Sequence, residues 1–185
     1  FSDSDTVTLS REDLYRILRQ QQIKVPDTFV VRANAPLKNE IFRDLWTRFH
    51  TPLLVRPLHK NAEVPSKIVR LFHDLENTIR EYHHRGVDMH VLTYRKLHTT
   101  SVAVLPNFRR QKVYVPMWVD TFPENDGLPN KDSRMQPHLQ APEFRKENMK
   151  AMATKVYTAL GLTAPACIDF VSHNNEYMVV NIDLN

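Results

Sequence analysis

Apolar and polar positions repeat along the chain with two different periods, and each period predicts one kind of element. Apolar residues three or four positions apart favour helices over about residues 10–22, 37–49, 74–86 and 142–161. Short runs rich in β-branched and aromatic residues favour strands over about residues 28–32, 51–57, 89–97, 100–105 and 113–119. Residues 120–142 show neither period, so they predict a long loop.

The last segment, residues 166–185, predicts a β-hairpin, because two apolar runs flank the polar turn 173–175. Asp169 lies on the first predicted strand, and Asn181 and Asp183 lie on the second, where alternation places them on one side. In a hairpin closed at this turn, Asp169 lies nearly opposite them. Three oxygen-bearing side chains that converge in this way suit Mg²⁺, which takes hard oxygen ligands.

Two interpretations of these polar residues stay open. Asp and Asn near strand ends are often solvated edge residues that bind nothing. However, Asn181 and Asp183 lie inside the apolar run 179–184, where an unpaired carboxylate is costly to bury. This placement favours a metal site without excluding the solvated edge.

Composition indicates a globular chain of ordinary make-up. The 185 residues are 42% hydrophobic and 25% charged, which suits one domain or two small lobes packed together. No run approaches the ~20 apolar residues that a membrane-spanning helix needs, and we expect no membrane partner. The single cysteine, Cys167, excludes an internal disulfide and fits a reducing, cytoplasmic environment. The first residue is Phe, which is consistent with a processed or truncated chain.

Charge and glycine usage exclude some kinds of site. The formal net charge is +4, and the basic residues are scattered, so the sequence disfavours nucleic acid as a partner. The basic turn 108–112 lies beside aromatic residues, and a solvated hairpin tip is favoured over an RNA contact there. The three glycines, Gly86, Gly127 and Gly161, are too far apart for a glycine-rich phosphate loop.

The two strands of the predicted hairpin carry a family resemblance. Ala-Cys-Ile-Asp-Phe at 166–170 and Tyr-Met-Val-Val-Asn-Ile-Asp at 177–183 resemble the closing hairpin of ATP-grasp ligases, especially the D-alanine:D-alanine ligase group. That family has an Arg-apolar-Asp strand and a Glu-apolar-Asn strand, which hold two magnesium ions. Asp169 matches the family Asp, while Asn181 and Asp183 fall at the Glu and the Asn. The resemblance therefore implies a Mg²⁺ site in which acid and amide have changed places.

Two further segments resemble nucleotide-binding parts of the family. Leu-Leu-Val-Arg-Pro at 53–57 resembles the family's apolar-Val-Lys-Pro strand, which implies that Arg56 holds phosphates during catalysis. Residues 59–66 stand where the family has a Gly-Ser-Ser-Val-Gly loop, and His59 and Lys60 would supply charge in its place. Arg16 and Lys131 match, by position, basic residues of the family that face the nucleotide.

The segment after residue 93 resembles the family's adenine-binding linker. The resemblance implies that Tyr94 replaces an acid and that backbone groups of Arg95, Lys96 and Leu97 face the adenine. Thr99 falls where the family has a ribose-binding Glu, and Cys167 falls where it has an Arg that stabilises the reacting acyl group. These two departures weaken the match at the ribose and at the acyl group.

Taken over residues 10–185, the resemblance implies an α+β ATP-grasp fold with two lobes and nucleotide between them. The smaller lobe is expected at about residues 51–95, and residues 1–9 are expected to be a loose terminus. The implied function is ATP-dependent ligation of a carboxylate to an amine through an acyl-phosphate, with ATP, Mg²⁺ and a small amino-acid or peptide substrate. The main alternative is a non-catalytic domain that binds nucleotide, peptide or a protein partner. A third option is a basic RNA-contacting module, which would require the positive side chains to gather on one surface. A homo-oligomer or a longer parent chain stays open.

Overall fold

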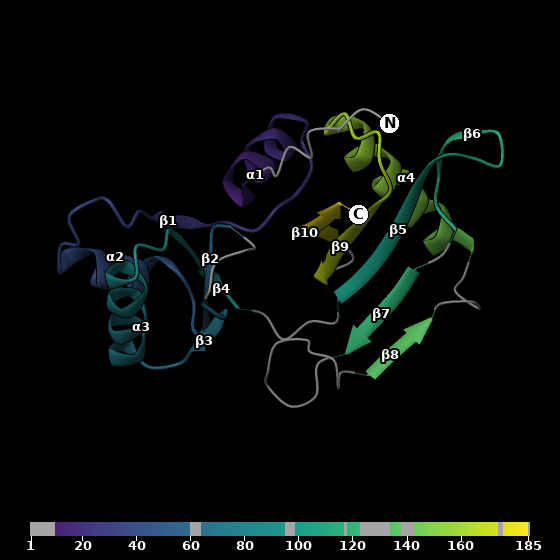
Figure 1. Ribbon diagram of the computed structural model, residues 1–185. Coiled ribbons are helices and arrows are strands. Elements are labelled where there is room, and N and C mark those ends of the chain that lie inside the picture. The colour runs from purple at the N-terminus through teal and green to yellow at the C-terminus, as the bar shows by residue number, and fades with distance from the viewer. Residues whose placement is uncertain are drawn as a thin grey trace. The chain divides into compact units, whose positions relative to one another are not determined.

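The computed structural model describes residues 10–59, 64–94, 99–116, 118–122, 134–137, 143–173 and 176–184 (Figure 1). The helices are α1 (Arg11–Gln20), α2 (Glu40–Arg48), α3 (Phe72–His84) and α4 (Glu143–Ala159). The strands are β1 (Phe29–Val31), β2 (Leu53–Pro57), β3 (Lys67–Val69), β4 (Met89–Thr93), β5 (Thr99–Phe108), β6 (Gln111–Tyr114), β7 (Trp118–Phe122), β8 (Arg134–Pro137), β9 (Ala166–His173) and β10 (Glu176–Leu184). None of the helices within these ranges is long and apolar enough to cross a membrane.

The chain forms two compact units. The first unit contains Asp13–Val25 and Leu97–Asn185, and the second contains Ser10–Glu12 and Pro26–Lys96. The boundary therefore falls inside α1, whose first two residues group with the second unit.

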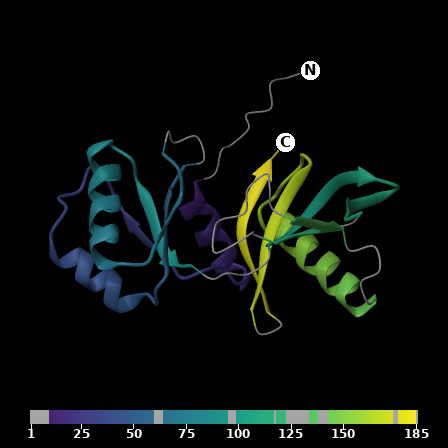
Figure 2. The same cartoon turned by 90° about the horizontal axis from the view of Figure 1, so that it is seen from below.

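The first unit is built on an antiparallel sheet in the order β10-β9-β5-β7-β8, with β6 paired to the end of β5. One face of this sheet packs against α1 and α4, as Figure 2 shows for α4. Helix α4 contributes an apolar side at three- and four-residue spacing, as the sequence predicts. The buried core on this face includes Leu14, Leu18, Val102, Val104, Met149, Ala153, Val156, Ile168, Phe170, Val179 and Ile182.

The second unit pairs a four-stranded antiparallel sheet, in the order β1-β4-β2-β3, with helices α2 and α3. Alternate residues of β2 and β4 point to the helices, and their core includes Phe42, Leu45, Leu53, Val55, Leu75, Ile79, Tyr82, Met89 and Val91. Leu54, Arg56, His90 and Leu92 therefore lie on the other face of this sheet.

A glycine follows the end of each of the two longest helices, α3 and α4. Gly86 after α3 and Gly161 after α4 have φ angles of +70° and +62°, which residues with a side chain adopt only at a cost. The next residue in each case donates its N–H five residues back, from Val87 to Tyr82 and from Leu162 to Tyr157. Each helix thus ends in a glycine C-cap that turns the chain into the following strand.

Three predictions from the sequence differ from the structure. The helix predicted from about residue 74 begins earlier, at Phe72, so Asp74 lies in its first turn. The predicted strand at 113–119 is two strands, β6 and β7, separated near Pro116. The predicted loop at 120–142 contains the end of β7 and all of β8.

Candidate functional site

The C-terminal hairpin forms as the sequence predicts, with β9 and β10 paired antiparallel. Asn181 pairs with Asp169 across the two strands, and Asp183 pairs with Cys167. Their alternate neighbours, Ile168, Phe170 and Ile182, belong to the buried core. Asp169, Asn181 and Asp183 therefore all lie on the sheet face opposite the core.

A β-bulge sets this register. The pairing shifts by one residue between Val179 and Asn181, so Val180 is an extra residue on β10. The carbonyl of Val180 accepts a hydrogen bond from the Tyr15 hydroxyl of α1 at 2.9 Å, and the Val179 N–H donates to the Lys24 carbonyl at 3.0 Å. If Val180 paired with Asp169 in a regular ladder, Asn181 would lie opposite Ile168 on the core face, so the bulge brings the amide opposite Asp169.

Four polar side chains meet on this face, and we call them the oxygen cluster: Ser101, Asp169, Asn181 and Asp183. The Asn181 Nδ2 group donates to Asp169 Oδ2 at 3.0 Å and to Asp183 Oδ2 at 3.1 Å. The Ser101 hydroxyl donates to Asp169 Oδ1 at 2.6 Å. Ser101, Asp169 and Asn181 are half-buried, while Asp183 is exposed.

Two observations show that this cluster fits a divalent cation. In the described part of the chain, no Lys, Arg or His side chain pairs with Asp169, so its negative charge is not neutralised there. The Oδ1 atom of Asn181 is buried and has no hydrogen-bond partner among the described residues. Rotation of the amide by half a turn would exchange Oδ1 with Nδ2 and direct an oxygen toward both carboxylates. Two carboxylates and one amide oxygen form a donor set that suits Mg²⁺.

The sequence alone did not identify Ser101 as a member of the cluster. Its partner Asp169 is 68 residues away, and the contact depends on the pairing of β5 with β9. Within 10–59, 64–94 and the other described ranges, no three His, Cys, Asp or Glu side chains lie close enough together to hold a metal ion. The oxygen cluster has two carboxylates, and its other members are an amide and a hydroxyl.

Two adjacent residues of β5, Thr100 and Ser101, point to opposite faces of this sheet. Thr100 points to the core face, where its hydroxyl donates to Asp120 Oδ1 at 2.6 Å. Asp120 is 1% exposed, and its Oδ2 accepts a hydrogen bond from Arg145 of α4 at 3.1 Å. One strand thus presents two hydroxyl–carboxylate pairs, a buried pair that joins β5, β7 and α4, and the Ser101–Asp169 pair on the opposite face.

In the second unit, Arg56 lies on β2 directly opposite His90 of β4. Arg56 is 8% exposed and His90 is fully buried, on the face of the sheet opposite α2 and α3. Tyr94 follows β4, and its N–H donates to the Pro52 carbonyl at 2.8 Å.

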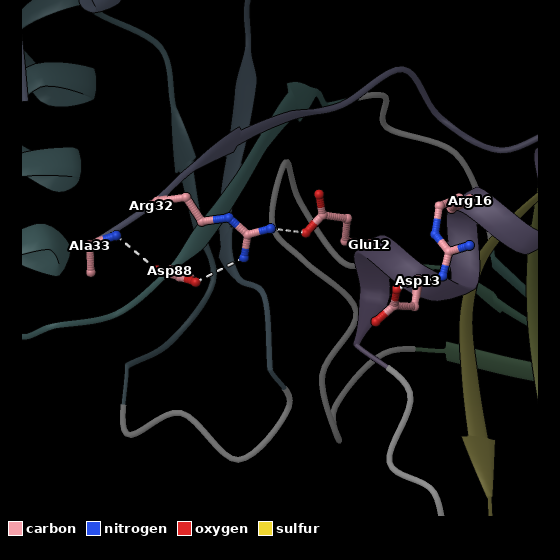
Figure 3. Close-up of polar contacts among 6 residues, drawn as sticks. All are labelled: Glu12, Asp13, Arg16, Arg32, Ala33 and Asp88. Atoms are coloured by element: carbon pink, nitrogen blue, oxygen red, sulfur yellow. Dashed lines mark hydrogen bonds and ion pairs between the residues drawn. The ribbon is translucent and has the colours of Figure 1, made fainter. Parts of the chain in front are cut away.

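His59 borders an open pocket of about 740 Å³ in the second unit, together with Arg32, Ala33 and Asp88. Figure 3 shows Arg32 between two carboxylates, with a hydrogen bond to Asp88 at 3.0 Å and an ion pair with Glu12. Burial alone would raise the pKa of Asp88, but the Ala33 N–H, at 2.7 Å, and Arg32 outweigh it, so the pKa lies below its usual value.

Because the pKa of Asp88 is lowered in the folded state, the free energy of unfolding should fall at acid pH. A carboxyl whose pKa is lower in the folded state stabilises the fold above the unfolded-state pKa, and that contribution is lost as pH falls below about 4. We expect Asp88→Asn to reduce the acid-dependent part of the unfolding free energy, measured by urea titration from neutral to acid pH. Asp44→Asn, an exposed change of equal charge, is the control. Identical pH profiles for Asp88→Asn and the unmodified protein would contradict this role.

The remaining candidates for nucleotide binding are one exposed residue of α1 and five residues that the structure does not describe. Arg16, shown with Asp13 in Figure 3, is an exposed residue of α1 and forms an ion pair with Asp13 at 2.9 Å. Lys60, Arg95, Lys96, Leu97 and Lys131 lie outside the described residues.

Comparisons with known proteins give a family and a fold. The family model described as the D-ala D-ala ligase C-terminus matches residues 17–185. A comparison with curated protein sequences finds no match.

Solved structures of similar fold include D-alanine–D-alanine ligases from two organisms. The Bacillus anthracis enzyme has a TM-score of 0.75 at 16% identity, over 96% of this chain and 57% of its own. Its ATP complex has a TM-score of 0.73 at 16% identity, over 96% of this chain and 56% of its own. The Coxiella burnetii enzyme has a TM-score of 0.77 at 16% identity, over 96% of this chain and 47% of its own. This chain therefore spans about half the length of these ligases, and the expected α+β ATP-grasp fold is confirmed.

Proposed function

Because the chain belongs to the family of D-alanine:D-alanine ligase C-terminal domains, we propose that it is the ATP- and Mg²⁺-binding part of a carboxylate–amine ligase. The observation that carries this proposal is the oxygen cluster, in which the predicted ligands Asp169, Asn181 and Asp183 meet on one sheet face. The ATP complex of the Bacillus anthracis ligase supports ATP as the nucleotide.

The reaction proposed follows the family's chemistry. A carboxylate oxygen of the first substrate bonds to the γ-phosphorus of ATP, and ADP leaves, which gives an acyl-phosphate. The amine of the second substrate then attacks the acyl carbon, and phosphate leaves with the bonding electrons. When bound, Mg²⁺ supplies positive charge that stabilises the transferred phosphoryl group.

The residues of this chain have separate tasks in that proposal. Asp169 and Asp183 supply carboxylate oxygens, and Asn181 supplies an amide oxygen. Ser101 occupies Oδ1 of Asp169 and so fixes the orientation of that carboxylate. Arg56 supplies a guanidinium to the phosphates, since a planar guanidinium can bind phosphate oxygens in pairs.

Other assignments rest on the family resemblance alone. Arg16, His59, Lys60 and Lys131 are proposed to contact the nucleotide, and Tyr94 with Arg95, Lys96 and Leu97 to bind the adenine. D-alanine is the first substrate to test, since it is named for the related ligases.

Calorimetric titration with ATP, with and without Mg²⁺, tests the proposal. We expect ATP to bind in the presence of Mg²⁺ and to bind much more weakly when EDTA removes the metal. Equal affinity in both conditions would argue against a ligase function. No heat of binding in either condition would contradict ATP as a ligand of this chain.

A non-catalytic binding domain is the second candidate. Cys167 stands where the family has the Arg that stabilises the acyl group, and this favours loss of the chemical step while nucleotide binding remains. ADP release in the presence of ATP, Mg²⁺ and D-alanine distinguishes the two candidates. Mg²⁺-dependent ATP binding without ADP release would support the second.

Ser101→Ala should weaken Mg²⁺-dependent ATP binding by about tenfold, because Asp169 loses the hydroxyl that orients it. ATP binding in EDTA should not change. Ser101→Thr, which keeps the hydroxyl, should restore most of the affinity. Calorimetry of the two variants measures this difference, and equal affinities for Ala and Thr would rule out an orienting role for the hydroxyl.

A further inference from the structure

The end of β5 and the whole of β6 form a two-stranded ribbon outside the main sheet. Among the described residues, the pairing of β5 with β7 reaches Val102, and its pairing with β9 reaches Val104. From Leu105 onward, β6 is the one described strand that pairs with β5, and no other described strand pairs with β6. Figures 1 and 2 show this ribbon extending beyond the other strands of the first unit.

The turn of the ribbon has an unusual sequence for its backbone. Arg109 and Arg110 connect the paired residues Phe108 and Gln111, and both have positive φ angles, of 49° and 61°. A two-residue turn with positive φ at both positions strongly prefers Asn-Gly, because side chains longer than Asn are strained there. Two arginines at such positions give up stability, which points to a use for their side chains.

Aromatic side chains hold one of these arginines in place. The rings of Phe108 and Tyr114 have centroids 5.1 Å apart, and the Arg109 guanidinium lies 5.6 Å from each centroid. Arg109 Nη1 also donates to the Tyr114 hydroxyl at 3.3 Å. Phe108 remains 44% exposed. The ribbon therefore presents a guanidinium and an aromatic ring together at its exposed end.

All charged side chains of this ribbon are positive. Arg109, Arg110 and Lys112 are exposed, and residues 105–116 contain no Asp or Glu. Across the described ranges, no carboxylate forms an ion pair with any of these three cations. The three charges are therefore available to an external anion.

We propose that the ribbon tip, defined as Phe108, Arg109, Arg110, Lys112 and Tyr114, is a contact site for single-stranded RNA. The three cations bind successive phosphates, and an unpaired base stacks on the Arg109 guanidinium or the Phe108 ring. A membrane surface fits the same charge less well. Insertion into lipid requires an extended apolar tip, whereas Phe108, the one apolar residue here, packs against Tyr114 and Arg109. This site does not depend on the proposed ligase function.

The salt dependence of RNA binding tests the proposal. We expect labelled oligouridine of about 12 nucleotides to bind, with a slope of log K against log salt of about −2, since three phosphates are neutralised. The measurement is fluorescence anisotropy between about 50 and 200 mM salt. The variant Arg109→Asn/Arg110→Gly should reduce the slope to about −0.7 and lower the affinity at least about tenfold.

This variant should fold, because Asn-Gly suits the backbone of the turn, and its melting temperature should rise. A loss of RNA binding could therefore not be attributed to unfolding. The matched control is Lys38→Asn/Arg43→Asn, which removes two exposed cations from the second unit and should leave the slope near −2. Phe108→Ala should weaken binding at an unchanged slope, because it removes stacking and not charge.

Three results would overturn the proposal. The first is an absence of RNA binding at low salt. The second is binding to vesicles that contain phosphatidylserine in place of RNA, which would assign the tip to a membrane surface. The third is equal binding of inorganic polyphosphate with no effect of Phe108→Ala, which would show attraction to any polyanion.

Discussion

Replacing Asp169 by asparagine is expected to weaken Mg²⁺-dependent ATP binding by about 100-fold or more, since even residues behind a metal ligand cost up to that factor. The substitution removes one negative charge at nearly constant volume. The new amide can still accept from Ser101, and it leaves the backbone pairing of β9 with β10 unchanged. The fold should therefore survive while the metal-dependent part of ATP binding is lost.

Two controls make this result specific to the oxygen cluster. Asp44→Asn removes the same charge from an exposed position on α2 and should leave ATP affinity unchanged. ATP binding in EDTA should be equal for Asp169→Asn and the unmodified protein, because no metal takes part. An Asp169→Asn variant that keeps its Mg²⁺-dependent affinity would show that Asp169 is not a ligand.

Replacing Asp120 by alanine is expected to lower the free energy of unfolding by about 3 kcal/mol. Asp120 is 1% exposed and accepts hydrogen bonds from Thr100 and Arg145. Its removal leaves the Thr100 hydroxyl buried without its acceptor and Arg145 without its carboxylate. The Arg145 side chain is 25% exposed, so water can solvate part of it, which places the loss at the lower end for a broken buried pair.

A double-mutant cycle isolates the ion pair in this loss. Urea titration of Asp120→Ala, Arg145→Met and the double variant should give a coupling energy above about 1 kcal/mol, because the two groups are in contact. Additive effects would contradict the assigned contact. Below its melting temperature, Asp120→Ala should bind ATP and Mg²⁺ normally, since Asp120 lies on the core face of the sheet.

We therefore expect Asp169 to act in metal binding and Asp120 to act in stability, on opposite faces of one sheet. Both accept a hydrogen bond at 2.6 Å from adjacent hydroxyls of β5. One carboxylate is buried against a helix and holds the fold, and the other lies on the polar face with an amide and a second carboxylate. The pair of variants therefore tests whether sheet face decides the role of each acid.

Local patterns predicted the hairpin and the convergence of its polar side chains because the necessary contacts are close in sequence. Asp169 and Asn181 are 12 residues apart, and alternation places Asn181 and Asp183 on one side of β10. The bulge at Val180 then brings that side to the face that carries Asp169. The same reasoning predicted the four helices. The bulge at Val180 could not be predicted, since it depends on Tyr15 and Lys24 from a distant segment.

Contacts that depend on the pairing of strands far apart in the sequence could not be predicted from it. Ser101 joins the oxygen cluster through the β5–β9 pairing, and His90 lies opposite Arg56 because β4 pairs with β2. Strands β3 and β8 have three and four residues, which is too short for a period to emerge. The basic residues of the ribbon tip illustrate the same limit, because only the pairing of β5 with β6 brings Tyr114 beside Phe108 and Arg109.

A crystal structure of the protein with a non-hydrolysable ATP analogue and Mn²⁺ in place of Mg²⁺ tests the central claim most directly, since anomalous scattering locates the metal. We expect Mn²⁺ at about 2.0–2.2 Å from carboxylate oxygens of Asp169 and Asp183, with the Asn181 amide oxygen turned toward it. Mn²⁺ bound elsewhere, or the amide nitrogen of Asn181 still between the two carboxylates with nucleotide present, would contradict the claim that the oxygen cluster holds the metal.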